Sequence, residues 1–366
     1  MSENKTESLS ASSIIYHILR TGAVGISLTN ISETVKQDSY ISIIIGIIAG
    51  LIPIAIYLYI MNTYKDLSII EINEKVFGKK IGSVINIALS IFIYSFSAIT
   101  LWNLADFTNS QFLNETPTFV IMFIFLIPVI YILCKGIITI ARTSLLIFYI
   151  NVIVYLFIII CLVGEIDLTN MLPFMESKIP DILTGSYSFI AYNILPFFIL
   201  TIIPKNSIKN KEKFNKQSLI MYMLCSLVTL SVCIFVIGIF GINLASVLLY
   251  PEYHVLKRIS IFSTIERIES ILSITWILSF FITITMGLYY VNRNIQHLTN
   301  VKKTSIQKII SIVISILLLI ISEYSFTNLT QAQSFLRLIY PHLIWFFLLI
   351  IPAVIAIMCK IKKKAN

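Results

Sequence analysis

SYISIIIGIIAGLIPIAIYLYI, residues 39–60, is an apolar run without a charged side chain. Its 22 residues would form a helix of roughly 33 Å at about 1.5 Å per residue. The hydrocarbon core of a bilayer is about 30 Å thick, so the run predicts a membrane-spanning helix. A barrel is excluded, because the run lacks the alternation of apolar and polar residues found in barrel strands.

The rest of the chain has the same character. Apolar residues make up 57% of its 366 residues and charged residues only 12%, whereas soluble domains average about 45–50% and ~25%. This composition excludes a secreted, nucleic-acid-binding or ordinary cytosolic protein. The predicted fold class is an all-α integral membrane protein with ten transmembrane helices. We place these spans at 13–33, 39–60, 82–107, 118–134, 138–163, 182–203, 217–239, 264–291, 305–322 and 338–358.

The basic residues predict the orientation of these spans. With both termini in the cytoplasm, the inner segments hold 18 Lys and Arg, the outer loops five and the spans four, which accounts for all 27. Positive charge accumulates on the cytoplasmic side, so the net charge of +9 is a topology signal. We predict a polar cytoplasmic tail at 1–12, one transmembrane domain at 13–358 and a basic cytoplasmic tail at 359–366.

Two long connections suggest an internal repeat. After the second span, Ser68 and Glu71 form a capping-box pattern ahead of a short amphipathic helix that Gly78 ends. After the seventh span, residues 242–262 form a long outer connection. The two connections hold matching places in the halves 13–163 and 182–358. They indicate a five-plus-five inverted repeat, a design of transporters that bind substrate near the membrane midplane.

Interruptions fall in the first span of each half. The first span contains Gly22-Ala23-Val24-Gly25, and the sixth contains Asn193 and Pro196. Glycine weakens a helix by about 1 kcal/mol relative to alanine, and proline removes a backbone hydrogen bond. Broken helices 1 and 6 would leave main-chain groups free to bind a substrate. The alternative is close packing through small residues and a proline kink without a ligand.

Two other spans offer walls for such a site. One face of the eighth span carries Trp276, Ser279, Thr283, Gly287 and Tyr290. The third span has a polar stripe (Ser90, Tyr94, Ser97) and an opposite aromatic and apolar stripe (Phe92, Phe96, Ile99, Asn103). Because a pocket for a small zwitterion needs apolar walls with few polar groups, Phe92 and Phe96 are the favoured walls. Packing between helices is the alternative for either stripe.

Charged residues within the spans are few. Arg20 and Arg142 are assigned to the cytoplasmic ends of their spans, where long side chains reach the interface. Asp106 is assigned to the outer end of the third span, and no carboxylate to the midplane. No GxSxG, P-loop or HExxH motif is present, and the cysteines and histidines lack metal-ligand spacing. We therefore expect no enzyme activity, no cofactor and no metal.

Several segments resemble the spore germination permease family, the B subunits of nutrient germinant receptors. The most specific is Tyr250-Pro251, then Ile259–Phe262 and Glu266–Glu269, then Trp276 and Phe280-Phe281. Weaker matches are Gly78 with Gly82, the spacing from Gly136 to Arg142, Leu172-Pro173, Pro204 before a lysine-rich loop and Pro352 before the lysine tail. One departure is Pro196-Phe197-Phe198, where family members often have an acidic residue after a glycine.

The resemblance implies membership of the amino acid–polyamine–organocation superfamily, with a ligand between broken helices 1 and 6 that helices 3 and 8 line. Carried onto this chain, it implies a substrate site made of Gly22, Gly25, Phe92, Phe96, Asn193, Leu195 and Thr283. It also implies germinant-receptor A and C subunits as partners, a location in the spore inner membrane and no nucleic-acid partner.

The predicted function is a permease-like receptor subunit that binds a small nutrient, an amino acid, and signals germination with its partner subunits. One alternative is an autonomous amino-acid/cation symporter. The other is an ion-conducting or scaffold subunit that binds no ligand. Ligand identity and any coupled ion are not encoded in a recognisable motif.

Overall fold

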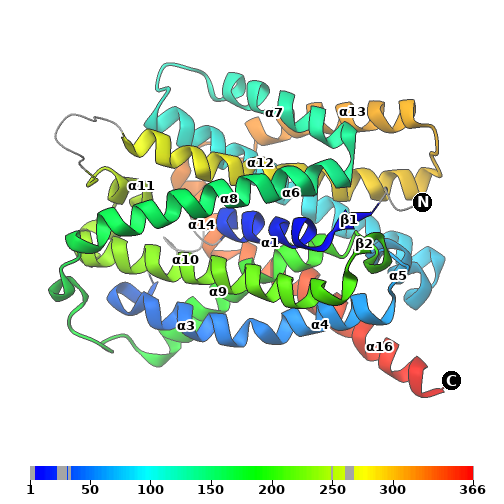
Figure 1. Ribbon diagram of the computed structural model, residues 1–366, viewed down its shortest axis with the longest axis horizontal. Coiled ribbons are helices and arrows are strands. Elements are labelled where there is room, and N and C mark those ends of the chain that lie inside the picture. Colours follow the sequence, from blue (N-terminus) through cyan, green and yellow to red (C-terminus); the bar gives the residue numbers. More distant parts are fainter. Residues whose placement is uncertain (1–4, 23–30, 32–33, 249, 260–267, 366) are drawn as a thin grey trace.

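The computed structural model describes residues 5–22, 31, 34–248, 250–259 and 268–365. These residues form a bundle of long helices whose axes run mostly along one direction (Figure 1). In chain order, the first half contains β1 (Thr6–Glu7), α1 (Ser8–Gly22), η2 (Lys36–Asp38), α3 (Ser39–Ala49), α4 (Leu51–Thr63), α5 (Ile69–Phe77), α6 (Lys79–Gln111), α7 (Thr118–Lys135) and α8 (Ile137–Leu162).

The connection and the second half contain η3 (Val163–Glu165), η4 (Leu168–Met171), α9 (Ile179–Leu200), η5 (Lys205–Ser207), β2 (Ile208–Lys209), α10 (Lys211–Ala245), α11 (Pro251–Leu256), α12 (Ile268–Thr299), α13 (Thr304–Glu323), α14 (Leu329–Leu338), α15 (Tyr340–Trp345), η6 (Phe346–Ile350) and α16 (Ile351–Ala365). Within the described ranges, nine helical stretches are long and apolar enough to cross a membrane. They correspond to the second to tenth predicted spans. The first predicted span, 13–33, contains α1 and a segment outside the described residues.

In an inverted repeat, a contact between two helices recurs between the equivalent helices of the other half, and several helix contacts of this protein do so. Helix α1, the first of one half, packs against α8 and α10, and α9, the first of the other half, packs against α15 and α3. Likewise α7 contacts α12, and α13 contacts α6. Each of these contacts has its counterpart in the other half, and the central pair α6 and α12 joins the two halves. The predicted inverted repeat is confirmed.

The α6–α12 contact depends on a glycine. A Cβ atom at Gly287 would collide with Oγ of Ser97, which would have to rotate away, so the glycine lets α12 approach α6 closely. The polar stripe of α6 faces α12 and α13. Oγ of Ser90 accepts a hydrogen bond from Asn294 on α12 (2.6 Å), and the hydroxyl of Tyr94 donates one to the Ile314 carbonyl on α13 (2.6 Å). Helix packing is the role of this stripe.

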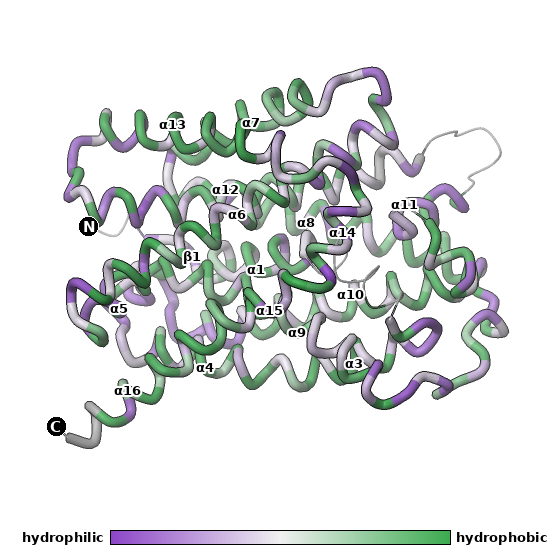
Figure 2. The backbone as a smooth tube through the Cα atoms, turned by 180° about the vertical axis from the view of Figure 1, so that it is seen from behind, coloured by the Kyte–Doolittle hydropathy of each residue, from purple (hydrophilic) through white to green (hydrophobic). Residues whose placement is uncertain are grey.

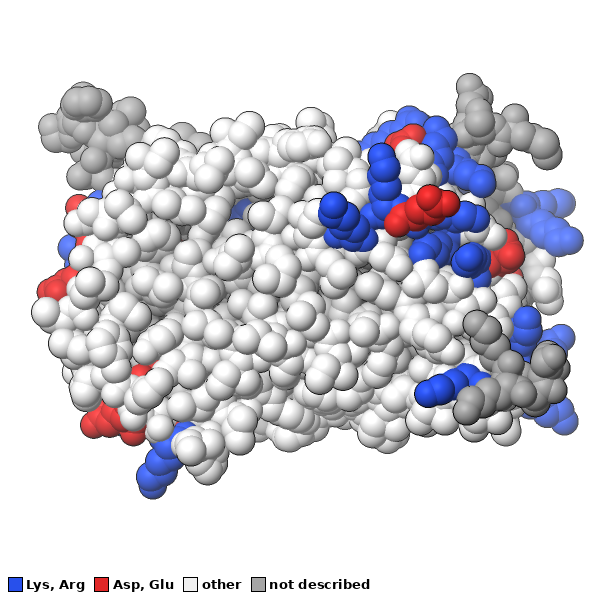
Figure 3. Space-filling model, turned by 60° about the horizontal axis from the view of Figure 1, so that its bottom comes forward, with Lys and Arg blue, Asp and Glu red and all other residues white. Residues whose placement is uncertain are grey.

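The surface is that of a membrane protein. Hydrophilic segments gather at the two ends of the bundle, and hydrophobic helices lie between them (Figure 2). Large apolar side chains on the outer helices α7, α8 and α13 are exposed, for example Phe123, Ile160 and Ile316. Burial in lipid is the environment that such side chains need. A broad belt nearly free of charge separates the ends, and Lys and Arg gather at one of them (Figure 3).

We call that end of the bundle the basic end. It carries α5, the connection 205–213 and the residues that begin the described chain. Here Thr6 pairs with Ile208 and Glu7 with Lys209 in a short parallel sheet, and Nζ of Lys209 lies 3.1 Å from Oε1 of Glu7. Helix α1 starts at Ser8, five residues before the predicted span, because residues 8–12 pack against α10 instead of forming a free tail. The far end of the bundle carries α11 and η3.

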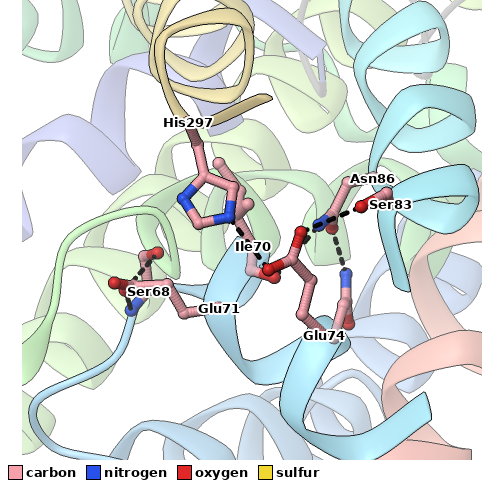
Figure 4. A network of polar contacts seen from close by, with 8 residues as sticks. Ser68, Ile70, Glu71, Glu74, Ser83, Asn86 and His297 are labelled. Atoms are coloured by element: carbon pink, nitrogen blue, oxygen red, sulfur yellow. Dashed lines mark hydrogen bonds and ion pairs between the residues drawn. The ribbon is translucent and has the colours of Figure 1, made fainter. Parts of the chain in front are cut away.

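The amphipathic helix α5 forms where the sequence predicts it. The carboxylate of Glu71 accepts hydrogen bonds from the backbone N–H and the hydroxyl of Ser68, both at 2.8 Å, which completes the capping box. Gly78 ends the helix with a φ of +83°, a conformation that favours glycine. Figure 4 shows how α5 is then tied to its neighbours: Glu74 accepts from His297 on α12 (3.0 Å) and from Ser83 on α6 (2.9 Å).

The Glu74 contacts predict an acid-sensitive attachment of α5. Partial burial acts to raise the pKa of Glu74, but the hydrogen bonds from His297 and Ser83 outweigh it and hold the pKa below its ordinary value of 4.5. A carboxyl group whose pKa is lowered on folding stabilises the fold above its ordinary pKa, and the stabilisation is lost as the pH falls through the lowered value. Because the group is near the surface, we expect less than about 1 kcal/mol.

The measurement is thermal unfolding of the purified protein from pH 6 down to acid. Below pH 4.5, the ordinary pKa of a glutamate side chain, the wild type should lose more stability than the Glu74→Gln variant does. An equal loss in both proteins would contradict the prediction. Glu165→Gln, a change of an exposed carboxylate at the far end of the bundle, is the control and should follow the wild type.

Candidate ligand site

Gly22, the first glycine of the predicted interruption, lies in the centre of the bundle. It is the last residue of α1 before the residues that the structure leaves undescribed, and the second half of Ser8–Gly22 is buried throughout. Helix α1 is surrounded by α8, α9, α10 and α12. A Cβ atom at Gly22 would meet the ring of Tyr192 on α9 at 3.5 Å, so two of the helices predicted to form the site are in contact. Gly25 lies outside the described residues.

Helix α9 corrects the prediction of a broken sixth helix. It runs without interruption from Ile179 to Leu200, through Asn193 and Pro196. The Nδ2 group of Asn193 donates to the Phe189 carbonyl one turn back (2.7 Å), and such side-chain bonds, with packing by neighbouring helices, let a membrane helix tolerate proline. The glycine of this span serves close packing instead, because a Cβ atom at Gly185 would meet Oγ of Ser42 on α3 at 2.8 Å.

Thr283 of α12 faces the last turn of α1. Its hydroxyl lies 3.0 Å from Oγ1 of Thr21 and 3.3 Å from the His17 carbonyl. One turn earlier on the same face, Oγ of Ser279 lies 3.2 Å from Nδ1 of His17. The face of the eighth span that the sequence singles out therefore binds α1 through buried polar groups.

Phe92 and Phe96 reach the same region from α6. Both rings stack on Tyr340 of α15, with centroid distances of 5.5 and 6.4 Å. Tyr340 in turn stacks on Tyr192 (6.3 Å), the residue that Gly22 faces. The aromatic stripe of the third span thus lines the centre of the bundle, as the choice between its two stripes predicts.

Asn193 and Leu195 are both buried on α9. Asn193 lies one turn from Phe189, whose ring occupies the space that a Cβ atom at Gly46 of α3 would need. The Oδ1 atom of Asn193 has no hydrogen-bond partner among the described residues. Phe92, Phe96 and Thr283 therefore gather around residues 17–22 of α1, which include Gly22, whereas Asn193 shares the face of α9 that packs on α3.

Arg20 corrects a second prediction. Its side chain does not reach the cytoplasmic interface but is only 7% exposed, in the last turn of α1. Its Nη2 atom donates to Oγ1 of Thr275 on α12 (2.9 Å). When the side-chain amide of Asn151 on α8 is oriented with its oxygen toward Arg20, that oxygen accepts a hydrogen bond from Nη1 of Arg20 at 3.2 Å. The guanidinium lies within the bundle because α1 already starts at Ser8, so that about three helical turns separate Arg20 from the basic end.

A cavity opens beside Arg20, toward the far end of the bundle. We call it the Glu252 cavity. Its volume is about 60 Å³. Its walls come from α1, α8, α10, α11 and α12, and are formed by Arg20, Tyr155, Ile158, Leu162, Val228, Val232, Phe235, Glu252, Tyr253, Val255, Leu256, Ser273 and Trp276.

Glu252 is the functional candidate that sequence reasoning missed. It follows Tyr250-Pro251 in the first turn of α11, and its Oε2 atom is buried without a hydrogen-bond partner among the described residues. Burial raises the pKa of this carboxyl to about 8. A carboxylate in a connection between spans looks solvated in sequence. The signal that could have found it is the apolar character of the segment around it, which predicts that the connection folds back onto the bundle.

These features define a membrane protein of the transporter type, with two inverted halves and a polar centre beside residues 17–22 of α1. The chain is similar over 97% of its length to Mhp1, a nucleobase-cation-symport-1 family transporter, with a TM-score of 0.71, 11% identity and 78% of that chain covered. It is also similar to a variant of the Eremococcus coleocola manganese transporter, with a TM-score of 0.65, 14% identity, and 96% of this chain and 82% of that chain covered. At these identities the likeness concerns the fold.

The family is shown by sequence. A profile described as "Spore germination protein" matches residues 8–330, so the chain belongs to that family, and the resemblance found in its motifs is confirmed. Among its relatives in Bacillus subtilis (strain 168), spore germination protein YndE is 25% identical over 75% of this chain and 76% of its own length. Spore germination protein A2 is 23% identical over 69% of each chain. The chain is a germination permease-like membrane protein related to nutrient transporters.

Proposed function

We propose that this chain is the nutrient-binding, permease-like subunit of a spore germinant receptor. The observation that carries the proposal is the family match across residues 8–330 in a chain with a transporter fold. The nutrient is a small amino acid that binds beside α1, where Gly22, Phe92, Phe96 and Thr283 gather. Gly25, Asn193 and Leu195 complete the proposed set of binding residues.

The mechanism is a shift between two arrangements of the bundle. A ligand moves such an equilibrium only if it binds one arrangement better than the other. Helix α1 is suited to respond, because it contacts α9 at Gly22 and α12 at Thr283. The change is passed to A and C subunits in the spore inner membrane. The basic end and both termini face the cytoplasm, in line with the distribution of Lys and Arg.

The decisive experiment is germination of spores that lack this gene, tested with one nutrient at a time. We expect the response to at least one amino acid to be lost and to return when the gene is restored. Purification of the tagged chain should recover the A and C subunits. Normal germination of the deletion strain with every nutrient would contradict the proposal.

An autonomous amino-acid/cation symporter is the second candidate, and it is supported by the likeness to Mhp1, a cation symporter by name. Uptake of labelled amino acids by the isolated chain in proteoliposomes would favour it. A germination defect without any amino-acid binding would instead favour a scaffold or ion-conducting subunit.

A further inference from the structure

The Glu252 cavity has one basic and one acidic side chain on mostly apolar walls. Arg20 of α1 contributes a guanidinium, and Glu252 of α11 contributes a carboxyl group. Apolar contacts come mainly from α8 and α10, through residues such as Ile158 and Val228. This combination, an apolar enclosure with a few polar groups that fix orientation, is the usual composition of a small-molecule site.

Two polar atoms of this cavity have no partner within the described part of the chain. They are Oε2 of Glu252 and Nε1 of Trp276, one an acceptor and the other a donor. Buried polar groups are nearly always hydrogen-bonded, and each exception calls for an explanation. The guanidinium of Arg20 also has five N–H donors, of which Thr275 and Asn151 engage one each. Residues that line one cavity therefore carry unpaired donors and an unpaired acceptor.

The charges and the volume restrict the ligand. A simple anion would meet the carboxyl group of Glu252, and a simple cation would meet the guanidinium of Arg20. A zwitterion satisfies both groups. The cavity measures about 60 Å³, less than half of the ~150 Å³ in a protein cavity that accommodates benzene, so a molecule with few heavy atoms fits best.

We propose that the Glu252 cavity binds a small neutral amino acid of the size of glycine or alanine, with its ammonium group at Glu252 and its carboxylate at Arg20 and Trp276. This proposal rests on the proposed nutrient-binding function and adds a site separate from the centre around Gly22. The occupant touches α1, α10, α11 and α12 at once. Since Arg20 lies two residues before Gly22, occupancy favours the arrangement in which α1 and α11 are held together.

The test uses the purified full chain in lipid nanodiscs and radiolabelled L-alanine and glycine at pH 8. The wild type should bind at least one of them. Glu252→Gln, which keeps the shape of the side chain and removes its charge, should weaken binding at least about 30-fold, as expected for loss of a buried charged hydrogen bond. The matched control is Glu165→Gln, an outer carboxylate that is exposed, and it should bind like the wild type.

Ligand analogues test the same contacts without a mutation. Propionate lacks the ammonium group of alanine and ethylamine lacks the carboxylate, so each should compete at least about 30-fold less well than alanine. Alanine affinity should also rise by up to about 50-fold from pH 6 to pH 8, because binding of the ammonium group requires an ionised Glu252, whose pKa burial raises to about 8. The other ionisable side chains on the cavity walls are Arg20, Tyr155 and Tyr253. Glu252→Gln should show no such rise.

Each outcome decides the matter. Unchanged alanine binding by Glu252→Gln overturns the proposal, as does a wild type that binds neither amino acid up to about 10 mM. If Thr283→Leu abolishes the germination response while Glu252→Gln leaves binding and response intact, the proposed function stands and the Glu252 cavity does not. If gene deletion leaves germination unchanged but binding still depends on Glu252, the cavity stands and the receptor role fails.

Discussion

Replacing Gly22 with leucine is expected to raise the nutrient concentration needed for half-maximal germination by about 100-fold, the upper end of what overpacking by 1–3 kcal/mol produces. A Cβ atom at this position meets the Tyr192 ring at 3.5 Å, an ordinary contact, and the backbone of Gly22 is not left-handed. The further carbon atoms of leucine would have to occupy the space of that ring. Helix α1 would then be displaced from α9, at the point where the proposed ligand binds.

Gly22→Ala is the matched control for this effect. Its single added carbon atom fits against Tyr192, so the response should stay within a few fold of the wild type. Both variants are measured in spores, with immunoblots to show equal protein levels. If Gly22→Leu spores respond normally at a normal protein level, the centre around Gly22 is not the nutrient site.

Replacing Gly82 with alanine is expected to detach α5 from α6. A Cβ atom there would lie 2.5 Å from Cα of Glu74 and 2.7 Å from its backbone nitrogen. These are main-chain atoms of α5, so no side-chain rotation relieves the clash. We expect a loss of about 2–3 kcal/mol in the free energy that holds α5 in place. In a solvent-exposed helix, glycine to alanine would stabilise by up to ~1 kcal/mol. Destabilisation by Gly82→Ala would therefore indicate the clash with α5.

Hydrogen exchange reports this loss directly. The amides of residues 69–77 should exchange at least about 10-fold faster in Gly82→Ala, because local opening becomes less costly. The hydrogen bond between Asn73 on α5 and Asn86 on α6 (2.7 Å) should weaken with it. Gly164→Ala is the control, because a Cβ atom at Gly164 has no neighbour within 4 Å. Unchanged protection of residues 69–77 in Gly82→Ala would show that α5 is not held by this close approach.

Helix α5 and the long apolar spans were predictable because their causes are local. The capping box joins Ser68 to a residue three positions away, and a run such as 39–60 is recognised by its own length. The family resemblance was also readable from short motifs. By contrast, the break predicted at Pro196 was overturned by contacts with neighbouring helices, which no single segment encodes.

The candidate site divides in the same way. The shared aromatic face of Phe92 and Phe96 was predictable, since they form one stripe of a regular helix, and their role as walls of a ligand site stays a prediction. The burial of Arg20 and Glu252 was not predictable, because each depends on where a helix starts or how a connection folds back. In both cases the neighbours that decide the environment are remote in the chain: Thr275 lies 255 residues after Arg20.

By itself, the amino-acid sequence determined that this protein crosses the membrane many times, in two related halves, with its basic residues at one end. Bilayer thickness imposes a length on each apolar run, and that length is visible in one dimension. Only the tertiary structure decided which polar groups share a cavity. Desolvation and hydrogen bonding act between atoms in space, and α1, α11 and α12 meet at Arg20 and Glu252 only after folding.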